Sequence, residues 1–319
     1  MNASLIILCL ASLGMIGVTA SLVTRLALPH LDRVVDRLAA RHRARVWLSL
    51  AVLPAALGLL ALLAALLPAF GLGVDHCLGH SVGSHHPHLC PHHSAVMPGL
   101  LVVLVATAVV VRVGLALVEL IRNALLTRAT ARLLEEGSER RGDRRVFESA
   151  EPQAFVLGLV SPKLYLSRGL LALDDDVVAP AVAHERAHVR ARDGLWRALL
   201  PVLSMLHLPG VAAELRARLV GAQELAADDE AARELGDPVR VAASLLALAR
   251  LSAPRTSPGL SFMHGDLETR VRALLDPRAR STASPTPALA LAFGALVVTI
   301  GALHDPVHHA LETILGVLS

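Results

Sequence analysis

The chain has little charge and very few aromatic residues. Of its 319 residues, 18% are charged and 3% are aromatic, whereas 54% are hydrophobic, so the apolar mass consists of Ala, Leu and Val. A mean hydropathy of +0.56 excludes an ordinary soluble domain. Lys163 is the only lysine, which we interpret as compositional bias. The net charge of +3 therefore rests on arginines, and these cluster beside apolar runs, which indicates membrane topology rather than a nucleic-acid partner.

Cysteine is also scarce. Cys9 lies in an apolar run, where we expect it to pack, and Cys77 and Cys90 lie in a histidine-rich loop at 75–93. This pair could form a disulfide if the loop faces an oxidising space. Short histidine-rich tracts bind metals or sense pH, because histidine titrates near neutral pH. A polar external hairpin is the simpler interpretation, and the sequence leaves both open.

Long apolar runs dominate the rest of the chain. Four of them are long enough to cross a bilayer, namely residues 5–23, 46–70, 95–111 and 288–303. The N-terminus has no positive charge and the first run exceeds the core of a signal peptide, so we expect a retained anchor. Arginines follow the first and third runs and precede the fourth, whereas both termini and the 75–93 loop have none. The positive-inside rule then places the termini and the loop outside and residues 122–284 in the cytoplasm.

Two charged residues, Arg112 and Glu119, follow the third apolar run. The interpretation we favour is that the helix leaves the membrane near Arg112, which extends its guanidinium to the headgroups. The other is a buried pair that faces a catalytic site.

The cytoplasmic segment has mixed polarity. Residues 122–136 read as an amphipathic helix, and residues 139–145 read as a charged linker. Short strands are expected at 144–148, 154–160 and 163–167, and a helix after the acidic residues 174–176. The apolar run 195–211 contains proline breaks, so we expect it to dip towards the membrane or to cover the core. A long helix follows at 211–235.

The most informative motif is H-E-x-x-H at residues 184–188, inside the first of these cytoplasmic helices. Positions i and i+4 share one face of a helix, so His184 and His188 can bind one metal ion. Glu185 then lies beside the metal, where it can take the proton of a bound water as a general base. The motif predicts a single catalytic Zn²⁺ ion and a hydrolase, most simply a peptidase.

A catalytic zinc site needs a third protein ligand. In the helix at 211–235, Glu224 and Asp228 are one turn apart on one face, in an apolar setting. We therefore predict that Glu224 is the third ligand and that Asp228 accepts a hydrogen bond from a ligand imidazole. Two acids on a solvated helix would be the simpler interpretation if no H-E-x-x-H preceded them.

Several sequence blocks resemble one family. They are Ala154-Phe155-x-x-Gly158, Pro162-x-x-Tyr165-Leu166-Ser167-x-Gly169-Leu170-Leu171, Ala183-His184-Glu185-x-Ala187-His188-x-x-x-x-Asp193, Glu224-x-x-x-Asp228 and Leu267-Glu268-x-Arg270-Val271-x-x-Leu274-Leu275. In this order they are similar to the BlaR/MecR-type membrane metallopeptidases, which are gluzincins related to the HtpX-type and CAAX prenyl proteases. The resemblance implies zinc on His184, His188 and Glu224, with Glu185 as base and Asp228 orienting a ligand histidine.

The chain departs from that family in three places. After the fourth apolar run only residues 304–319 follow, without the S-x-x-K of a penicillin-binding sensor domain, so direct covalent sensing of a β-lactam is not expected. Gln153 stands where HtpX-type relatives have an asparagine that contacts the substrate backbone. His207 and Pro209 resemble a family His-Pro pair with Leu208 inserted, so we interpret His207 as structural. Gln153 stays a weak substrate-binding candidate, as does Arg270, with His264 a second weak oxyanion donor.

The expected architecture is a polytopic α-helical membrane protein with four spans and a cytoplasmic α+β gluzincin zinc-peptidase domain between spans three and four. Its parts are a membrane region at 1–121, the peptidase domain at 122–284, and the fourth span with a short external tail at 285–319. We expect a multi-pass protein of the bacterial plasma membrane.

The expected function is cleavage of a cytoplasmic protein, in the family a transcriptional repressor, as part of signal-dependent regulation. Its partners are then a protein substrate of the winged-helix repressor type and the lipid bilayer, without direct nucleic-acid binding, and a homodimer stays open. One alternative is quality control of membrane proteins, and another is a non-catalytic signalling protein on a protease scaffold. A metal transporter is disfavoured, because spans one, two and four contain essentially no ionisable residues.

Overall fold

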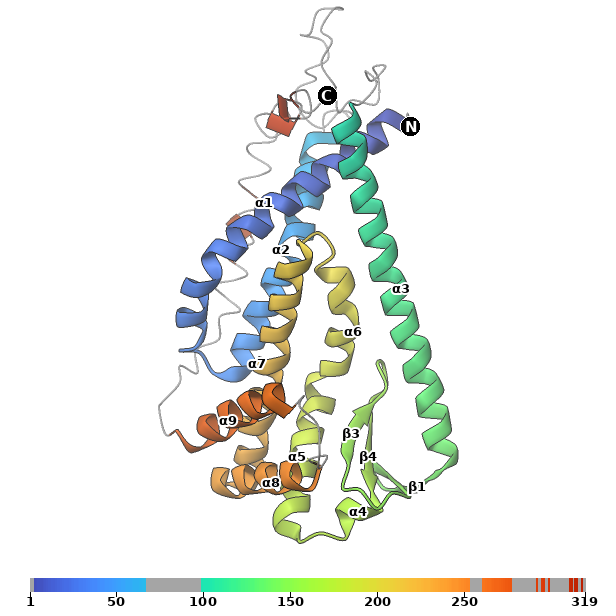
Figure 1. Cartoon of the computed structure of the whole chain (residues 1–319), viewed down its shortest axis with the longest axis vertical. Coiled ribbons are helices and arrows are strands. Elements are labelled where there is room, and N and C mark those ends of the chain that lie inside the picture. The colour runs from blue at the N-terminus through green and yellow to red at the C-terminus, as the bar shows by residue number, and fades with distance from the viewer. Residues whose placement is uncertain are drawn as a thin grey trace, which may run out of the picture.

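A computed structural model describes residues 3–66, 99–252 and 260–276, with scattered positions between 291 and 317. Among these residues, three helices are long and apolar enough to cross a membrane, by length and composition: α1 (Ala3–Val35), α2 (Ala40–Leu66) and α3 (Leu100–Glu136). An α+β part forms one end of the elongated molecule, beside the lower half of α3 (Figure 1). The 75–93 loop, the Cys77–Cys90 pair and nearly all of the expected fourth span lie outside the described residues, so these stay predictions.

The third helix runs on without a break through the charged positions where we expected a span to end. In α3, the guanidinium of Arg112 donates to the carbonyl oxygen of His207 at 2.7 Å, and Glu119 accepts from Arg216 at 3.1 Å. Arg112 and Glu119 therefore do not pair with each other. The guanidinium of Arg112 points to the turn at His207, inside the run 195–211 that was expected to dip towards the membrane or to cover the core, and its position at the headgroups stays a prediction.

That turn joins α6 (Asp193–Leu203) to α7 (Pro209–Leu235), and it lies among the three long helices. A Cβ atom on Gly17 of α1 would lie 2.4 Å from the carbonyl oxygen of Leu206, so only glycine permits this approach. The buried His207 ring contacts the Ser21 hydroxyl at 3.3 Å and the carbonyl of Leu50 at 2.9 Å. The turn is therefore fixed to α1 and α2, and His207 has structural contacts.

A four-stranded mixed sheet lies beside the lower half of α3 (Figure 1). Its strands are β1 (Ser138–Arg141), β2 (Arg144–Phe147), β3 (Ala154–Leu157) and β4 (Lys163–Ser167), in the order β1-β2-β4-β3. The three predicted strands are confirmed, the one at 163–167 with its predicted ends and the other two with shorter ends. The linker predicted at 139–145 is wrong, because β1 pairs with β2 across a turn in which Gly142 has φ of 65°. A charged edge strand lacks the apolar alternation by which strands are recognised.

The helix α5 (Asp175–Ala191) is the centre of the α+β part. One of its faces packs on the sheet and α4 (Arg168–Leu171), through a cluster of Leu164, Leu166, Leu170, Ala181 and Val182. Its other side packs against α7 and α8 (Pro238–Ser252), and α9 (Leu260–Leu275) packs against these two helices. Figure 1 shows α5 between the sheet and the α8–α9 pair. This sandwich holds the H-E-x-x-H helix rigidly between two apolar layers.

Candidate metal centre

The motif helix begins and ends at residues suited to those positions. Asp174 is its N-cap, and Asp175 and Asp176 in the first turn favour the positive end of the helix dipole. The helix stops at Arg192, whose left-handed φ of 54° turns the chain directly into α6. This sharp corner brings Asp193, the first residue of α6, back towards the last turn of α5.

The two motif histidines face each other across one helical turn. Their Nε2 atoms are 3.1 Å apart. The carboxylate of Glu224, from α7, reaches both: its Oε2 is 3.5 Å from Nε2 of His184 and its Oε1 is 3.5 Å from Nε2 of His188. These side chains are largely buried, with 11% exposed for each histidine and 17% for Glu224. The structure thus brings together the three side chains predicted to bind zinc.

A carboxylate holds the opposite nitrogen of each ring. His184 Nδ1 is 2.8 Å from Oδ1 of Asp228, and His188 Nδ1 is 2.7 Å from Oδ2 of Asp193. An ionised carboxylate only accepts, so both Nδ1 atoms donate, and in the neutral rings both Nε2 atoms present lone pairs to the same point. Two lone pairs at 3.1 Å, with a carboxylate beside them, repel each other unless a cation lies between them.

The electrostatics of the cluster lead to the same conclusion. Burial lowers the pKa of His188, but hydrogen bonds with Asp193 and Glu224 outweigh it and raise the pKa to about 9. Burial also opposes ionisation of Glu224, yet the two imidazoles, which in their protonated form donate from Nε2, hold its pKa below the usual value. The pKa of Glu185 is raised, chiefly by burial. The site therefore favours a positive charge at its centre and a proton-accepting carboxylate at its rim.

The spacing of these atoms fits a tetrahedral metal ion. Ligand atoms about 2.1 Å from a tetrahedral zinc lie about 3.4 Å from each other. The three observed separations among His184, His188 and Glu224 are 3.1, 3.5 and 3.5 Å. Among the residues that the structure describes, these three form the only cluster of histidines, cysteines or acids suited to a metal. Two imidazoles, one carboxylate and an open side are the donor set of a catalytic zinc.

The open side of the site is a cavity of about 400 Å³. Glu185 lines it together with His184 and Glu224, so its carboxylate shares the space in which a substrate would meet the metal. Gln153, just before β3, and Phe155, within it, also line the cavity. The Gln153 side chain donates to Glu151 at 3.0 Å, and its backbone N–H donates to Ser167.

Two arginines hold the acidic partners in place. Arg270 of α9 donates to both oxygens of Asp228, at 2.7 and 2.8 Å, and lies 3.4 Å from Glu224. The nearly buried Asp228 thus connects Arg270 to His184. On the other side, Arg197 donates to Glu224 at 2.8 Å and to Gln223 at 2.8 Å.

The sequence missed the roles of Asp193 and Arg197. Both lie in α6, four residues apart and therefore on one face. That spacing was a readable signal, but their approach to the site depends on the corner at Arg192. His264 lies in α9, and its side chain is outside the described residues.

No curated protein and no solved structure matches this chain. A model of one protein family, described as BlaR1 peptidase M56, matches residues 80–274, which is more than half of the chain. The match includes the motif helix, the helix that carries Glu224 and Asp228, and the α9 block with Arg270. The chain therefore belongs to the BlaR1 peptidase M56 family, a family of membrane metallopeptidases.

Proposed function

We propose that this protein is a zinc-dependent metalloendopeptidase. The observation that carries the proposal is the convergence of His184, His188 and Glu224, with a carboxylate behind each histidine. Zinc, when bound by these three residues, lowers the pKa of a water molecule and polarises the scissile carbonyl. The carboxylates of Asp193 and Asp228 fix both rings with Nε2 towards the metal, and this arrangement typically strengthens metal affinity by 10- to 100-fold.

Glu185 is the proposed general base. It lines the cavity beside His184, and burial raises its pKa above the usual value, so this carboxylate takes up a proton more readily than a solvated one. It would accept a proton from the attacking water and deliver it to the leaving amine. We assign Arg270 the role of positioning Asp228, because its guanidinium donates to both oxygens of that carboxylate. A direct contact with substrate stays a weaker hypothesis for Arg270.

The substrate would bind in an extended form along β3. This strand is an edge of the described sheet, paired only with β4, and its first residues line the cavity. An added peptide strand gains main-chain hydrogen bonds there. These bonds supply affinity that does not depend on the sequence of the substrate. Gln153, immediately before β3, is then placed to contact the substrate near the scissile bond.

Side-chain specificity would come from the far wall of the cavity. Val241, Leu245 and Leu248 of α8 form an apolar surface there, next to Pro180 and Ala181 of the motif helix. This lining favours an apolar substrate side chain next to the cleaved bond. The substrate class is therefore an extended, locally unfolded protein segment with an apolar residue at this position.

The metal assignment has a direct test with a matched control. Glu224→Ala removes a carboxylate that faces both histidines, whereas Glu230→Ala removes one from the same helix that pairs with Arg190. Purified full-length Glu224→Ala should contain little zinc, and Glu230→Ala should contain as much as the unaltered protein. Loss of zinc in Glu230→Ala but not in Glu224→Ala would contradict the assignment of Glu224 as the third ligand.

For the biological role, we infer a multi-pass protein of the bacterial plasma membrane with four spans, external termini and a cytoplasmic peptidase domain at 122–284. The arginine asymmetry and membership of the BlaR1 family support this arrangement. The substrate we propose is a soluble, winged-helix repressor cut in response to a signal. Proteins that accumulate in cells with Glu185→Gln test this: one stabilised repressor supports regulation, and a broad set of stabilised membrane proteins contradicts it.

A further inference from the structure

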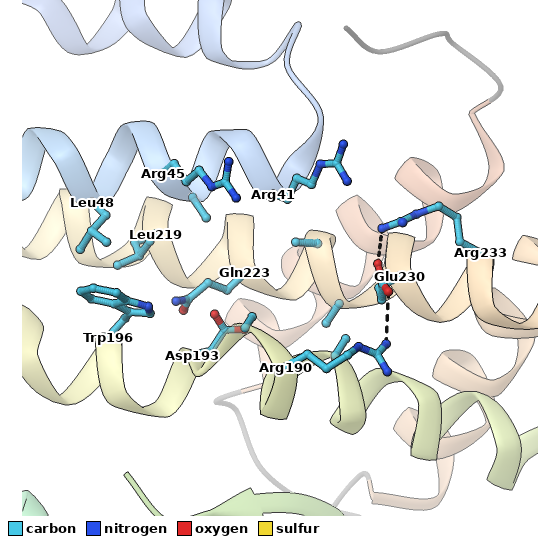
Figure 2. A pocket seen from close by; sticks show the side chains of 15 residues that line it. Arg41, Arg45, Leu48, Arg190, Asp193, Trp196, Leu219, Gln223, Glu230 and Arg233 are labelled. Carbon is cyan, nitrogen blue, oxygen red and sulfur yellow. Dashed lines mark hydrogen bonds and ion pairs between the residues drawn. The ribbon is translucent and has the colours of Figure 1, made fainter. Parts of the chain in front are cut away.

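A second cavity, of about 550 Å³, lies on the side of α5 away from the sheet. Its walls come from four helices, α2, α5, α6 and α7, and Figure 2 shows their side chains from close by. It is separate from the catalytic cavity, although Asp193, which holds His188, lines it.

The cavity changes in polarity from one end to the other. Leu48, Leu219 and Trp196 gather at one end, and Arg41, Arg190 and Arg233 lie at the other (Figure 2). Trp196 has 39% of its surface exposed, so its ring is available for contact. A ligand that fills this space needs an apolar part and an anionic part at a fixed distance from each other.

The charge of the cavity is positive. Its lining has four guanidinium groups, of Arg41, Arg45, Arg190 and Arg233, and two carboxylates, of Asp193 and Glu230. Both carboxylates already have partners, because Asp193 binds His188 and Glu230 binds Arg190 and Arg233. The lining therefore has two more guanidinium groups than carboxylates, and two of the four guanidinium groups, those of Arg41 and Arg45, come from α2.

The place of α2 identifies the source of the anion. Arg41 and Arg45 are in the first two turns of a helix whose residues Ala40–Ala64 are long and apolar enough to cross a membrane. With α2 in a bilayer, these guanidinium groups lie at the depth of the lipid phosphates. Leu48 lies one turn further into the apolar part, and Trp196 has the amphipathic ring typical of this interface. Basic pockets between membrane helices at this depth suit anionic headgroups.

We propose that this cavity binds an anionic phospholipid, with its phosphate against Arg41 and Arg45 and one acyl chain along Leu48, Leu219 and Trp196. The proposal rests on the membrane placement of α1–α3 described above. A soluble phosphate could meet the arginines but would leave the apolar end unfilled. The cavity thus selects a lipid by both charge and shape.

The chain allows a direct test, because Trp47 and Trp196 are its only tryptophans. In the full-length Trp47→Phe variant, Trp196 is the single fluorophore. This protein is placed in zwitterionic phospholipid vesicles with a small fraction of anionic phospholipid carrying brominated acyl chains, which quench tryptophan on contact. We expect saturable quenching at a low fraction of anionic lipid.

Arginine variants in the same background measure the headgroup contact. Arg41→Gln should weaken the apparent lipid affinity about fivefold, and Arg41→Gln with Arg45→Gln about thirtyfold, from about 1 kcal/mol for each arginine near a lipid surface. Arg37→Gln is the matched control: Arg37 is exposed, lies between α1 and α2, and does not line the cavity, so quenching should not change.

Other outcomes separate the alternatives. Equal quenching by the same fraction of brominated zwitterionic lipid overturns the selectivity for an anion. Relief of quenching by inorganic phosphate at millimolar concentration indicates a soluble anion as the natural occupant and overturns the lipid. Protein that floats with the vesicles without being quenched overturns the cavity proposal alone. Protein that does not float overturns the membrane placement on which it rests.

Discussion

Asp193→Asn tests whether the carboxylates behind the histidines act through the metal. Asp193 accepts from His188 Nδ1 at 2.7 Å, and the two side chains are only 10% and 11% exposed, so water cannot replace this contact well. An amide can donate as well as accept, and by donating to Nδ1 it would move the proton to Nε2, where the metal binds. The substitution keeps the shape of the side chain and removes its negative charge together with the fixed tautomer.

The expected loss of zinc affinity is large and specific. Changes behind a metal ligand cost 10- to 100-fold in affinity, or about 1.4 to 2.7 kcal/mol. The burial of this pair points to the upper half of that range. The assay is a competition titration of the full-length protein with a chromophoric zinc chelator, followed by peptidase activity at saturating zinc.

The matched control is Asp143→Asn. Asp143 also pairs with the motif helix, through Arg186 at 3.0 Å, but this pair is exposed and remote from the histidines. Its removal should change stability by less than about 1 kcal/mol and leave zinc affinity unaltered. Wild-type zinc affinity in Asp193→Asn would refute the reasoning, as would an equal loss in both variants.

Three further predictions follow from other parts of the molecule. Arg197→Gln frees the Glu224 carboxylate from a 2.8 Å hydrogen bond, so zinc affinity should fall about tenfold, and Arg197→Lys should recover part of this affinity. An unchanged zinc affinity of Arg197→Gln in a chelator titration would exclude this positioning role. Gly17→Ala forces a Cβ to within 2.4 Å of the Leu206 carbonyl and should destabilise the protein by about 1 to 3 kcal/mol in thermal unfolding, whereas Gly114→Ala, with open space around it, should not. Reporter fusions at residues 40 and 150 should read cytoplasmic and those at 82 and 315 external, and an external signal at 150 would contradict the proposed topology.

The core of the candidate site could be predicted from the sequence because its signals are local. His184 and His188 are one turn apart in one helix, and Glu224 with Asp228 repeats that spacing in another. Each pair can be read from a single window of sequence. The remaining inference, that the two helices meet, needed only the rule that a catalytic zinc takes three protein ligands.

What the sequence did not reveal depends on contacts between distant segments. Arg112 was interpreted as a residue at the membrane surface, but the turn at His207, 95 positions away, supplies its acceptor. Arg197 meets Glu224 only because Arg192 adopts a left-handed conformation that no pattern required. The strand β1 has three charged residues among its four, and its pairing with β2 follows from the turn at Gly142 rather than from hydrophobic alternation.

The most direct test of the central claim is the activity of Glu185→Gln compared with its zinc content. The amide keeps the size of the side chain but cannot take up a proton. General-base catalysis contributes about 10²- to 10⁴-fold. We predict that the purified full-length variant retains its zinc and loses cleavage of a peptide substrate by at least the lower of these factors. Retained zinc with near-normal cleavage would contradict the account.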